Sequence, residues 1–180
     1  MELTAGRVIL RPWNEDDAEE CYKYAKDPLV GPAAGWQIHT SVEESRQIIR
    51  DILSDPETYA IVLKETGLPI GSIGLHNNSF VNGGDEKELG YWIGVPYWGR
   101  GLAAEASEEL LRHAFEDIGL SRVWCSHYEE NKRSARVQEK LGFKYHHTTD
   151  NIFFSALNEY KTVNFRLMTK EDWFAKKHGR

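Results

Sequence analysis

The chain has 180 residues, 41% of them hydrophobic, and a formal net charge of -6. This length suits one domain with one buried core, residues 1–180, and argues against two domains. The acidic balance argues against a nucleic-acid partner, because binding to a phosphate backbone requires clustered Lys and Arg. No stretch approaches the roughly 20 apolar residues of a membrane span, so we expect no membrane partner.

The cysteine content and the two ends of the chain carry few special signals. Cys21 and Cys125 have no paired spacing and form no CxxC motif, which indicates neither a disulfide framework nor a zinc site. The first residues, MELTAGRVILRP, lack the apolar stretch of a signal peptide. A reducing cytoplasm is therefore the simplest location. The basic ending KKHGR is short and is interpreted as a frayed terminus.

The hydrophobic period changes several times along the chain, and each change marks a predicted element. In chain order these are a strand over Arg7–Arg11, a helix from Asn14 to Asp27-Pro28, a loop over Val30–Ser41, a helix from Ser41 to Leu53, strands over Tyr59–Lys64, Ile70–His76 and Glu88–Val95, a helix over Leu102–Asp117, a strand over Arg122–His127, a helix over Lys132–Leu141, and strands over Phe143–Thr148 and Tyr160–Met168.

Capping and turn residues support these boundaries. Asn14 is placed to cap the first helix, and Ser41 with Glu44 forms a capping box for the second. Turns are predicted around Gly67 and over Asn82–Asp85. The apolar faces of the second and third helices consist of Val42, Ile48, Ile49 and Ile52, and of Leu102, Ala106, Leu110, Ala114 and Ile118.

The order of the elements predicts an α+β fold. Strands joined by hairpins precede one strand–helix–strand unit, which excludes a purely alternating α/β protein. We expect a mixed sheet with an antiparallel N-terminal part and one parallel crossover through helix 102–117. A right-handed crossover places the loop 99–101 at the carboxyl end of strand 88–95, where open sheets bind ligands.

That loop lies in the stretch WIGVPYWGRGLAAEA, where a strand gives way to a helix. Gly99 and Gly101 flank Arg100, and the first turn of the following helix has unpaired N–H donors and a positive dipole end. The junction is therefore suited to an anion.

Three interpretations of the junction can be weighed on its residues alone. The segment from Gly99 to Ala104 satisfies G-x-G-x-x-A, the dinucleotide-binding fingerprint, but too few elements follow it for an NAD(P)-binding oxidoreductase. A P-loop lacks its Gly-Lys-Ser/Thr. The plainest interpretation is a tight turn between strand and helix.

A longer match decides between them. Residues 98–103, WGRGLA, resemble the acetyl-CoA loop of the GCN5-related N-acetyltransferases (GNAT), [Gln/Arg]-x-x-Gly-x-[Gly/Ala], with Trp98 in place of the first polar residue. The segments NKRS (131–134) and EKLGF (139–143), and the opening VILRPWNEDDAEECYKYAKDP, are similar to the RimJ/RimL branch of that family. The resemblance implies the GNAT fold, a central mixed, mostly antiparallel sheet with helices on both faces.

The resemblance also implies acetyl-CoA as co-substrate. The backbone can receive its pyrophosphate, with the two glycines permitting close approach; the residues involved are Gly99, Arg100, Gly101, Leu102, Ala103 and Ala104. In the family the preceding strand splays from its neighbour and pairs with the pantetheine arm, here through Ile93, Gly94 and Val95. The N–H of Val95 would then stabilise the developing oxyanion. An ordinary buried strand explains the apolar run WIGV equally well.

The proton-transfer groups are less well defined by the sequence. Ser134 matches a hydroxyl that lies near the thioester sulfur in the RimJ/RimL branch and could donate the proton to the thiolate. Asn131 is implied to contact the pantetheine, although both residues could simply cap their helix. Gln138 and Ser126 replace a tyrosine and a glutamate used in other branches. The base is then Glu88 or a water molecule, although Glu88 could also be a solvated acid at a strand end.

Acceptor specificity is expected to come from the N-terminal helices and the loop between them. Trp13, Trp36 and His39 are the candidate lining residues, and core packing of the tryptophans is the alternative. His146 and His147 are expected on opposite faces of a strand, so they form no ligand pair. No metal is implied.

The sequence therefore predicts an N-acetyltransferase that transfers an acetyl group from acetyl-CoA to a primary amine. Direct attack is expected, because neither cysteine occupies a motif position. The acceptor is a protein N-terminus or a small molecule, and the oligomeric state is left open between monomer and homodimer. A non-catalytic acyl-CoA-binding module is the alternative, with an NAD(P)-dependent oxidoreductase more remote.

Overall fold

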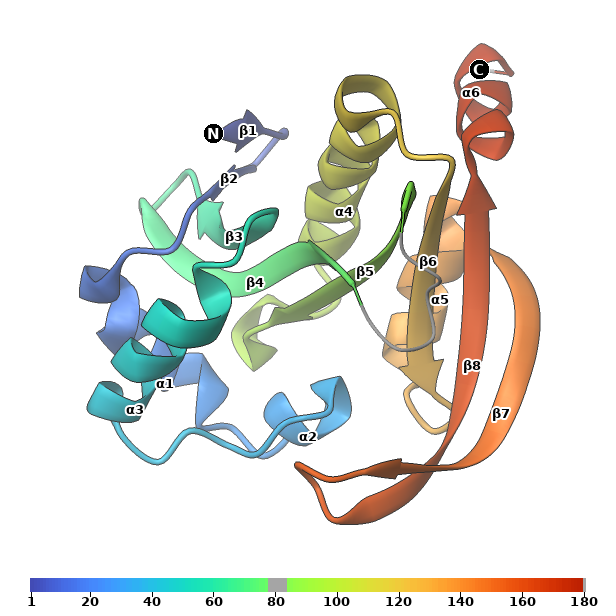
Figure 1. Cartoon of the computed structure of the whole chain (residues 1–180). Helices are drawn as coiled ribbons and strands as arrows, with labels where there is room; N and C mark the ends of the chain where they lie inside the picture. Colours follow the sequence, from blue (N-terminus) through green and yellow to red (C-terminus); the bar gives the residue numbers. More distant parts are fainter. Residues whose placement is uncertain (78–83, 180) are drawn as a thin grey trace.

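The computed structural model describes residues 1–77 and 84–179. Within them, eight strands form one sheet in the order β1-β2-β3-β4-β5-β6-β8-β7 (Figure 1). The strands are β1 Leu3–Thr4, β2 Val8–Arg11, β3 Thr58–Leu63, β4 Leu68–His76, β5 Glu86–Ile93, β6 Arg122–Tyr128, β7 Lys144–Phe154 and β8 Glu159–Thr169. Neighbouring strands are antiparallel except β5 and β6, which are parallel. The predicted mixed, mostly antiparallel sheet is confirmed.

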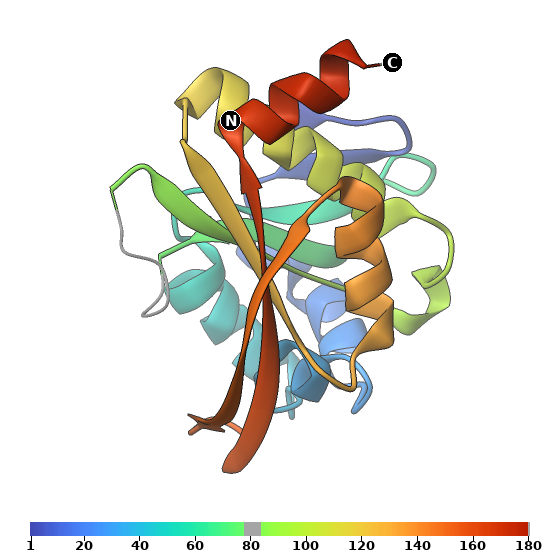
Figure 2. The same cartoon turned by 90° about the vertical axis from the view of Figure 1, so that its right-hand side faces the viewer.

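The helices cover both faces of this sheet. The helical segments are η1 Glu15–Asp17, α1 Ala18–Ala25, α2 Gly31–Ala34, α3 Val42–Ile48, η2 Ile49–Leu53, η3 Val95–Tyr97, α4 Leu102–Arg112, η4 His113–Ile118, α5 Lys132–Leu141 and α6 Lys170–His178. Figure 2 shows α5 beside the strongly twisted strands β6, β7 and β8. One parallel pair cannot make a dinucleotide-binding fold, which needs a mostly parallel sheet.

The described residues form three hydrophobic clusters. Two of them lie on opposite faces of the sheet, because strands alternate their side chains between faces. In β3, Tyr59, Ile61 and Leu63 pack in the cluster that contains the buried residues of α4. Ala60 and Val62 of the same strand pack on the other side, in the cluster that contains the buried residues of α1. The part of the sheet around β3 is therefore buried on both faces, as the GNAT resemblance implies, whereas most of β7 is exposed.

The parallel pairing of β5 with β6 is short. It joins Glu86 to Arg122, Lys87 to Val123 and Glu88 to Trp124. Beyond that point β5 continues to Ile93 while paired with β4, and β6 continues to Tyr128 while paired with β8. The two central strands thus diverge after Glu88, which leaves one edge of β5 open.

Several boundaries differ from the expectations. The strand expected over 88–95 begins at Glu86 and ends at Ile93, and Val95 begins the 3-10 turn η3. The expected loop over 30–41 contains α2. Of the predicted turn over 82–85, residues 82 and 83 lie outside the described residues. Ile52 and Ile118, expected on apolar faces, are exposed, since their helices end in π-helical turns that rotate the final side chains.

Residues 176–178 of the basic ending, predicted to be frayed, belong to α6, and residue 180 lies outside the described residues. Thr169 caps α6, and its hydroxyl accepts from the N–H of Asp172. Trp173 is buried and stacks on Phe115, with ring centroids 5.8 Å apart. One tryptophan anchors a helix whose other residues are mostly charged, which is why its composition resembles a loose end.

The predicted orientation of the two adjacent histidines of β7 is also wrong. A register shift between Tyr145 and His147 interrupts the alternation of β7, and a bulge of this kind brings neighbouring side chains together. The Nδ1 atoms of His146 and His147 lie 2.7 Å apart, so the rings do not point to opposite faces.

Candidate active site

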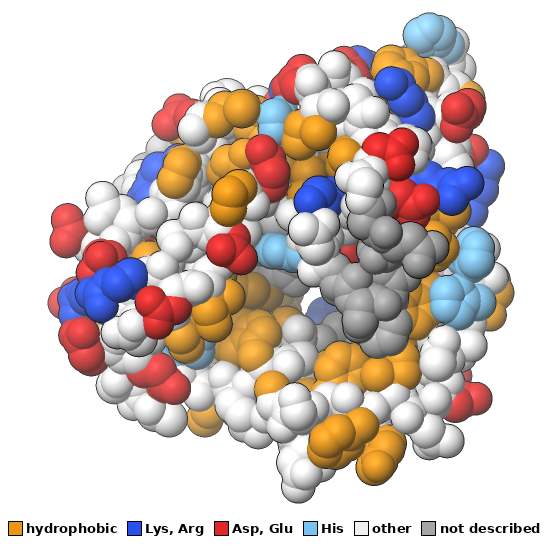
Figure 3. All heavy atoms as spheres, in the orientation of Figure 1, with side chains coloured by type: hydrophobic (Ala, Val, Ile, Leu, Met, Phe, Trp, Pro, Cys, Tyr) orange, Lys and Arg blue, Asp and Glu red, His pale blue; other side chains and the backbone are white. Residues whose placement is uncertain are grey.

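A cavity of about 810 Å³ lies where β5 and β6 diverge. It is lined from both faces of the sheet, by the start of α4 and the exposed side of α5 on one face and by α2 and the end of η2 on the other. Figure 3 shows hydrophobic side chains around a hollow near the centre of one face of the molecule. The divergence of the strands therefore opens a passage through the sheet.

The loop 99–101, which we call the glycine loop, forms one end of this cavity. Gly99 and Gly101 both have positive φ, +73° and +77°, and Gly101 is the N-cap of α4 without a side-chain hydrogen bond to the first turn. A Cβ at Gly101 would lie 3.7 Å from Arg7 Nη2 and 3.9 Å from Lys140 Nζ. The loop thus presents helix N–H groups to the cavity, with two cations close by.

The basic side chains at this end come mainly from α5. Arg133, Arg136 and Lys140 are exposed and line the cavity, because their spacing of three and four residues places them on one helix face. Sequence reasoning missed this stripe, although its spacing was visible. Arg100 is not among the described lining residues; its guanidinium lies over the Tyr97 ring, 5.6 Å from the centroid.

The open edge of β5 supplies backbone groups along the passage. Gly94 N–H donates to Ile70 O across to β4, so this N–H faces β4 and not the open edge. Since peptide groups alternate between the two sides of a strand, those of Leu89, Tyr91 and Ile93 point away from β4. Ile93 lines the cavity, whereas Gly94 and Val95 are not among the described lining residues.

Trp98 fixes the geometry at the end of that edge. Its indole Nε1 donates to Ile93 O at 2.9 Å. The Arg133 guanidinium lies 3.6 Å from the centroid of the same indole, a cation–π contact. The aromatic residue that stands in place of the usual polar one therefore connects the strand end to α5.

Ser134 is hydrogen-bonded at its hydroxyl by two other side chains. Tyr91 Oη lies 3.0 Å from Ser134 Oγ, and Gln138 Nε2 donates to Ser134 Oγ at 3.1 Å. Burial raises the pKa of Tyr91, so the phenol keeps its proton at neutral pH. Tyr91 is a candidate that sequence reasoning missed; its place in the cavity-lining strand next to the glycine loop was the available signal.

Asn131 has the role given by the plainer interpretation and also lines the cavity. Its Oδ1 accepts from the N–H of Ser134, which caps α5, and its Nδ2 donates to Ala33 O at 3.5 Å. Asn131 thus positions Ser134 and connects α5 to α2.

Glu88 is not a solvated acid at a strand end. It is the third residue of β5, lines the cavity and accepts from Ser126 Oγ at 2.5 Å. Burial raises the pKa of Glu88, although the Ser126 hydrogen bond opposes the shift. The ring of its cross-strand neighbour His76 also lines the cavity and lies over Gly74, where a Cβ would be 2.6 Å from the ring. The site therefore combines a carboxylate with an imidazole.

The three residues expected to line an acceptor pocket lie in two layers. Trp36 lines the cavity and meets Trp92 edge to face, with centroids 5.6 Å apart. Trp13 stacks on Trp92 from behind and donates to Ser72 Oγ at 3.0 Å. His39 is buried behind Trp36 and bonds to Ser45. Trp13 and His39 thus support the wall of the cavity rather than forming its surface.

The described residues contain neither a candidate metal cluster nor a candidate membrane-spanning helix. Across 1–77 and 84–179, no three His, Cys, Asp or Glu side chains gather in a group that could hold a metal ion. Within the same ranges, no helix has both the length and the apolar character needed to cross a membrane.

Comparison with known proteins agrees with the fold and the motifs. Residues 7–144 match the family model described as an acetyltransferase (GNAT) domain. The chain is 30% identical over 147 residues to the uncharacterized N-acetyltransferase p20 of Bacillus licheniformis, an alignment that covers 79% of this chain and 82% of that protein.

Solved structures share the whole architecture. An acetyltransferase of the GNAT family from Bacillus anthracis has a TM-score of 0.85 and 22% identity, over 95% of this chain and 99% of that one. A ribosomal-protein-S5-alanine acetyltransferase from Vibrio fischeri has a TM-score of 0.76 and 17% identity, over 96% and 98%. The family match, the curated relative and the shared fold lead to one conclusion: the chain belongs to the GNAT acetyltransferases and is an N-acetyltransferase enzyme.

Proposed function

We propose that the enzyme transfers an acetyl group from acetyl-CoA to a primary amine, and that it belongs to the RimJ/RimL branch of its family. The observation that supports this most directly is the cavity between β5 and β6, which joins the glycine loop at one end to Glu88 and an aromatic wall at the other. Such a passage suits two substrates that meet from opposite faces of the sheet.

The chain's own residues fit coenzyme A. The N–H groups at the start of α4, with Arg133, Arg136 and Lys140 around them, are complementary to a pyrophosphate. The open edge of β5 offers backbone donors and acceptors to the two amides of a pantetheine arm. Acetyl-CoA supplies the acetyl group, which the amine nitrogen takes by direct attack on the thioester, with release of the free thiol.

Two groups in the cavity can move the protons that this reaction requires. Glu88 accepts a proton from the ammonium form of the acceptor, and its raised pKa makes it a better base than an exposed carboxylate. Ser134 donates its proton to the departing thiolate. Tyr91 and Gln138 can both donate to Ser134 Oγ as it gives up its own hydrogen.

Direct attack is favoured over an acyl-enzyme by the state of the cysteine in the cavity. Cys125 lines the cavity but is buried, and burial raises the pKa of its thiol. A protonated thiol is a poor nucleophile. Both cysteines are free and buried, which also fits a reducing compartment such as the cytoplasm.

The decisive experiment measures free thiol released from acetyl-CoA with a panel of amines, which includes peptides with free N-termini and small-molecule amines. Calorimetry with coenzyme A and acetyl-CoA accompanies it. Turnover of acetyl-CoA with at least one amine is expected. Absence of binding heat would overturn the proposal at its first step, whereas binding without turnover on any amine would favour an acyl-CoA-binding module.

A further inference from the structure

The acceptor side of the cavity is lined mainly by apolar and aromatic side chains, with Glu88, its hydrogen-bond partner Ser126 and its cross-strand neighbour His76 among the polar groups. This composition restricts the amine. We define the acceptor chamber as the part of the cavity lined by Val30, Trp36, Glu88, Trp92, Tyr128 and Phe154. Trp36 meets Trp92 edge to face, and Tyr128 meets Phe154 edge to face with centroids 5.0 Å apart. Two aromatic pairs thus line the chamber, one against β5 through Trp92 and one against β6 through Tyr128.

Two glycines, one in α2 and one directly after it, let the chain pass close to these aromatic side chains. Gly35 has a φ of +95°, and a Cβ there would lie 2.9 Å from Tyr128 Oη. A Cβ at Gly31 would lie 2.7 Å from the Trp36 ring. These positions require glycine because the segment passes tightly over both aromatic pairs. In Figure 1, α2 lies between α1 and the far end of the β7–β8 hairpin.

The charges of the cavity are separated along its length. Among the described lining residues, Glu88 supplies the only carboxylate, and the three cations of α5 lie at the opposite end, around the glycine loop. A second ammonium group on the acceptor would find no second carboxylate here, and would lose hydration without a partner. An acidic acceptor would face Glu88.

We propose that the acceptor is a primary amine attached to an apolar, preferably aromatic, group and without a second charge beside it. This inference rests on the proposed function. Two sources share this chemistry: a free aromatic amine, and a peptide whose first residue is aromatic or bulky and apolar. Polyamines and amine-rich antibiotics do not fit it.

The test compares kcat/KM for 2-phenylethylamine, spermidine, and two peptides that differ only in a first residue of Phe or Lys. We expect the aromatic acceptors to exceed their cationic counterparts by about tenfold or more, the scale on which a fitted apolar pocket discriminates. The better of phenylethylamine and the Phe peptide identifies the source. Preference for spermidine or the Lys peptide would overturn the inference and leave the acetyltransferase function standing.

Adjacent phenylalanines provide a matched pair of variants. Phe154 lines the chamber, whereas Phe153 is half-exposed and packs on Tyr160 instead. Phe154→Ala should raise KM for phenylethylamine about tenfold without changing KM for acetyl-CoA, and Phe153→Ala should change neither. Equal effects of the two variants would contradict the chamber.

A second variant avoids any question of folding. Ile52 lines the cavity but is 58% exposed, so a polar side chain is tolerated there. Ile52→Asp adds a second carboxylate to the cavity lining. It should raise kcat/KM for spermidine relative to that for phenylethylamine, whereas Ile52→Asn should leave this ratio unchanged. If neither substrate responds to the added charge, the argument from charge fails. If no amine is acetylated by the wild type, the proposed function fails and this inference with it.

Discussion

At the scale of single residues, the cavity holds two proton-transfer candidates with different surroundings. Ser134 is hydrogen-bonded by Tyr91 and Gln138 on one side of the sheet. Glu88 is bonded by Ser126 on β6, next to the point where the strands diverge. The two groups thus lie on either side of the passage, as an acid and a base acting on opposite partners require.

Removal of the Ser134 hydroxyl should slow the reaction. We expect Ser134→Ala to lower kcat on the order of 10²-fold, the usual contribution of a general acid, and Tyr91→Phe to lower it less, since Gln138 still donates to Ser134. Steady-state thiol release with acetyl-CoA measures both. Ser107→Ala is the matched control, because that hydroxyl is buried in α4 away from the cavity and has no hydrogen-bond partner among the described residues. An unchanged rate for Ser134→Ala would disprove its role as acid.

The raised pKa of Glu88 predicts a pH dependence for the rate. Glu88 accepts a proton only as the carboxylate, so kcat/KM should fall as the pH drops through its raised pKa. Glu88→Gln should remove this acidic limb and lower the rate at neutral pH. Glu86→Gln controls for strand effects, since Glu86 lies on the same face of β5 but bonds to Trp124 and Arg122.

The raised pKa of Glu88 also affects the free energy of unfolding, but with the opposite dependence on pH from that of the rate. A carboxyl whose pKa is higher in the folded than in the unfolded chain binds protons more tightly when folded. Stability therefore falls as the pH rises from the unfolded pKa through the folded one, and Glu88→Gln should be no less stable than wild type at neutral pH. A large loss of stability in this variant would mean that its lost activity reflects unfolding.

At the scale of elements, α5 carries the cations that face the glycine loop. Each of Arg136→Gln and Lys140→Gln should raise KM for acetyl-CoA roughly two- to fivefold, the range for an exposed charge pair, and the effect should shrink at high salt. Lys144→Gln removes an exposed lysine that pairs with Asp172 on α6 instead. If all three variants behave alike, the stripe does not bind the phosphates.

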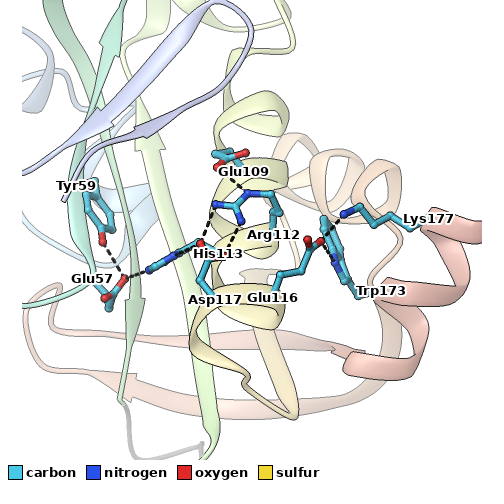
Figure 4. A network of polar contacts seen from close by, with 9 residues as sticks. All are labelled: Glu57, Tyr59, Glu109, Arg112, His113, Glu116, Asp117, Trp173 and Lys177. Carbon is cyan, nitrogen blue, oxygen red and sulfur yellow. Dashed lines mark hydrogen bonds and ion pairs between the residues drawn. The ribbon is translucent and has the colours of Figure 1, made fainter.

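The far end of α4 is held by a polar network, shown in Figure 4. Buried His113 bonds to Asp117 through Nδ1 and to Glu57 through Nε2, at 2.9 and 3.0 Å. Glu57 has a positive φ of 63°, uncommon for a residue with a side chain, and Tyr59 Oη donates to its carboxylate. The network therefore holds the strained link between η2 and β3, beside the acceptor side of the cavity.

Loss of this network should be costly. His113→Ala removes a buried ring and two hydrogen bonds, and we expect it to lower the free energy of unfolding by about 2 to 4 kcal/mol. Lys177→Ala breaks the ion pair that joins α6 to Glu116, which lies on η4 with His113 (Figure 4). This variant should cost under about 1 kcal/mol because the lysine is half-exposed. Urea unfolding followed by circular dichroism compares them. If the two variants lower the free energy of unfolding by similar amounts, His113 contributes no more to stability than an exposed ion pair.

For the molecule as a whole, the sequence predicts those features that depend on residues close together in the chain. Helix Lys132–Leu141 is predicted to the residue because Asn131 caps it and Gly142 ends it with a positive φ. The parallel crossover follows from the order of elements. Long-range contacts are what local patterns miss: α6 depends on one stacked tryptophan, and Trp13 and His39 lie behind the cavity wall because Trp92 and Trp36 fill the space in front.

The divergence of β5 from β6 also predicts how ligand binding changes the stability of the whole fold. Three residue pairs join the two halves of the sheet between these strands, so a ligand paired with the open edge of β5 should tie the halves together. Acetyl-CoA at 100 times its Kd should stabilise the fold by about 2.7 kcal/mol.

Amide hydrogen exchange can show where that ligand lies. The N–H groups of Tyr91 and Ile93 point into the divergence, whereas those of Gly90 and Trp92 point to β4. Acetyl-CoA should therefore slow exchange at Tyr91 and Ile93, together with the first turn of α4, and the amides of Gly90 and Trp92 serve as internal controls. Protection confined to α4 would place the phosphates correctly but contradict pairing along β5, and protection spread evenly over the sheet would indicate general stabilisation without a ligand in the passage.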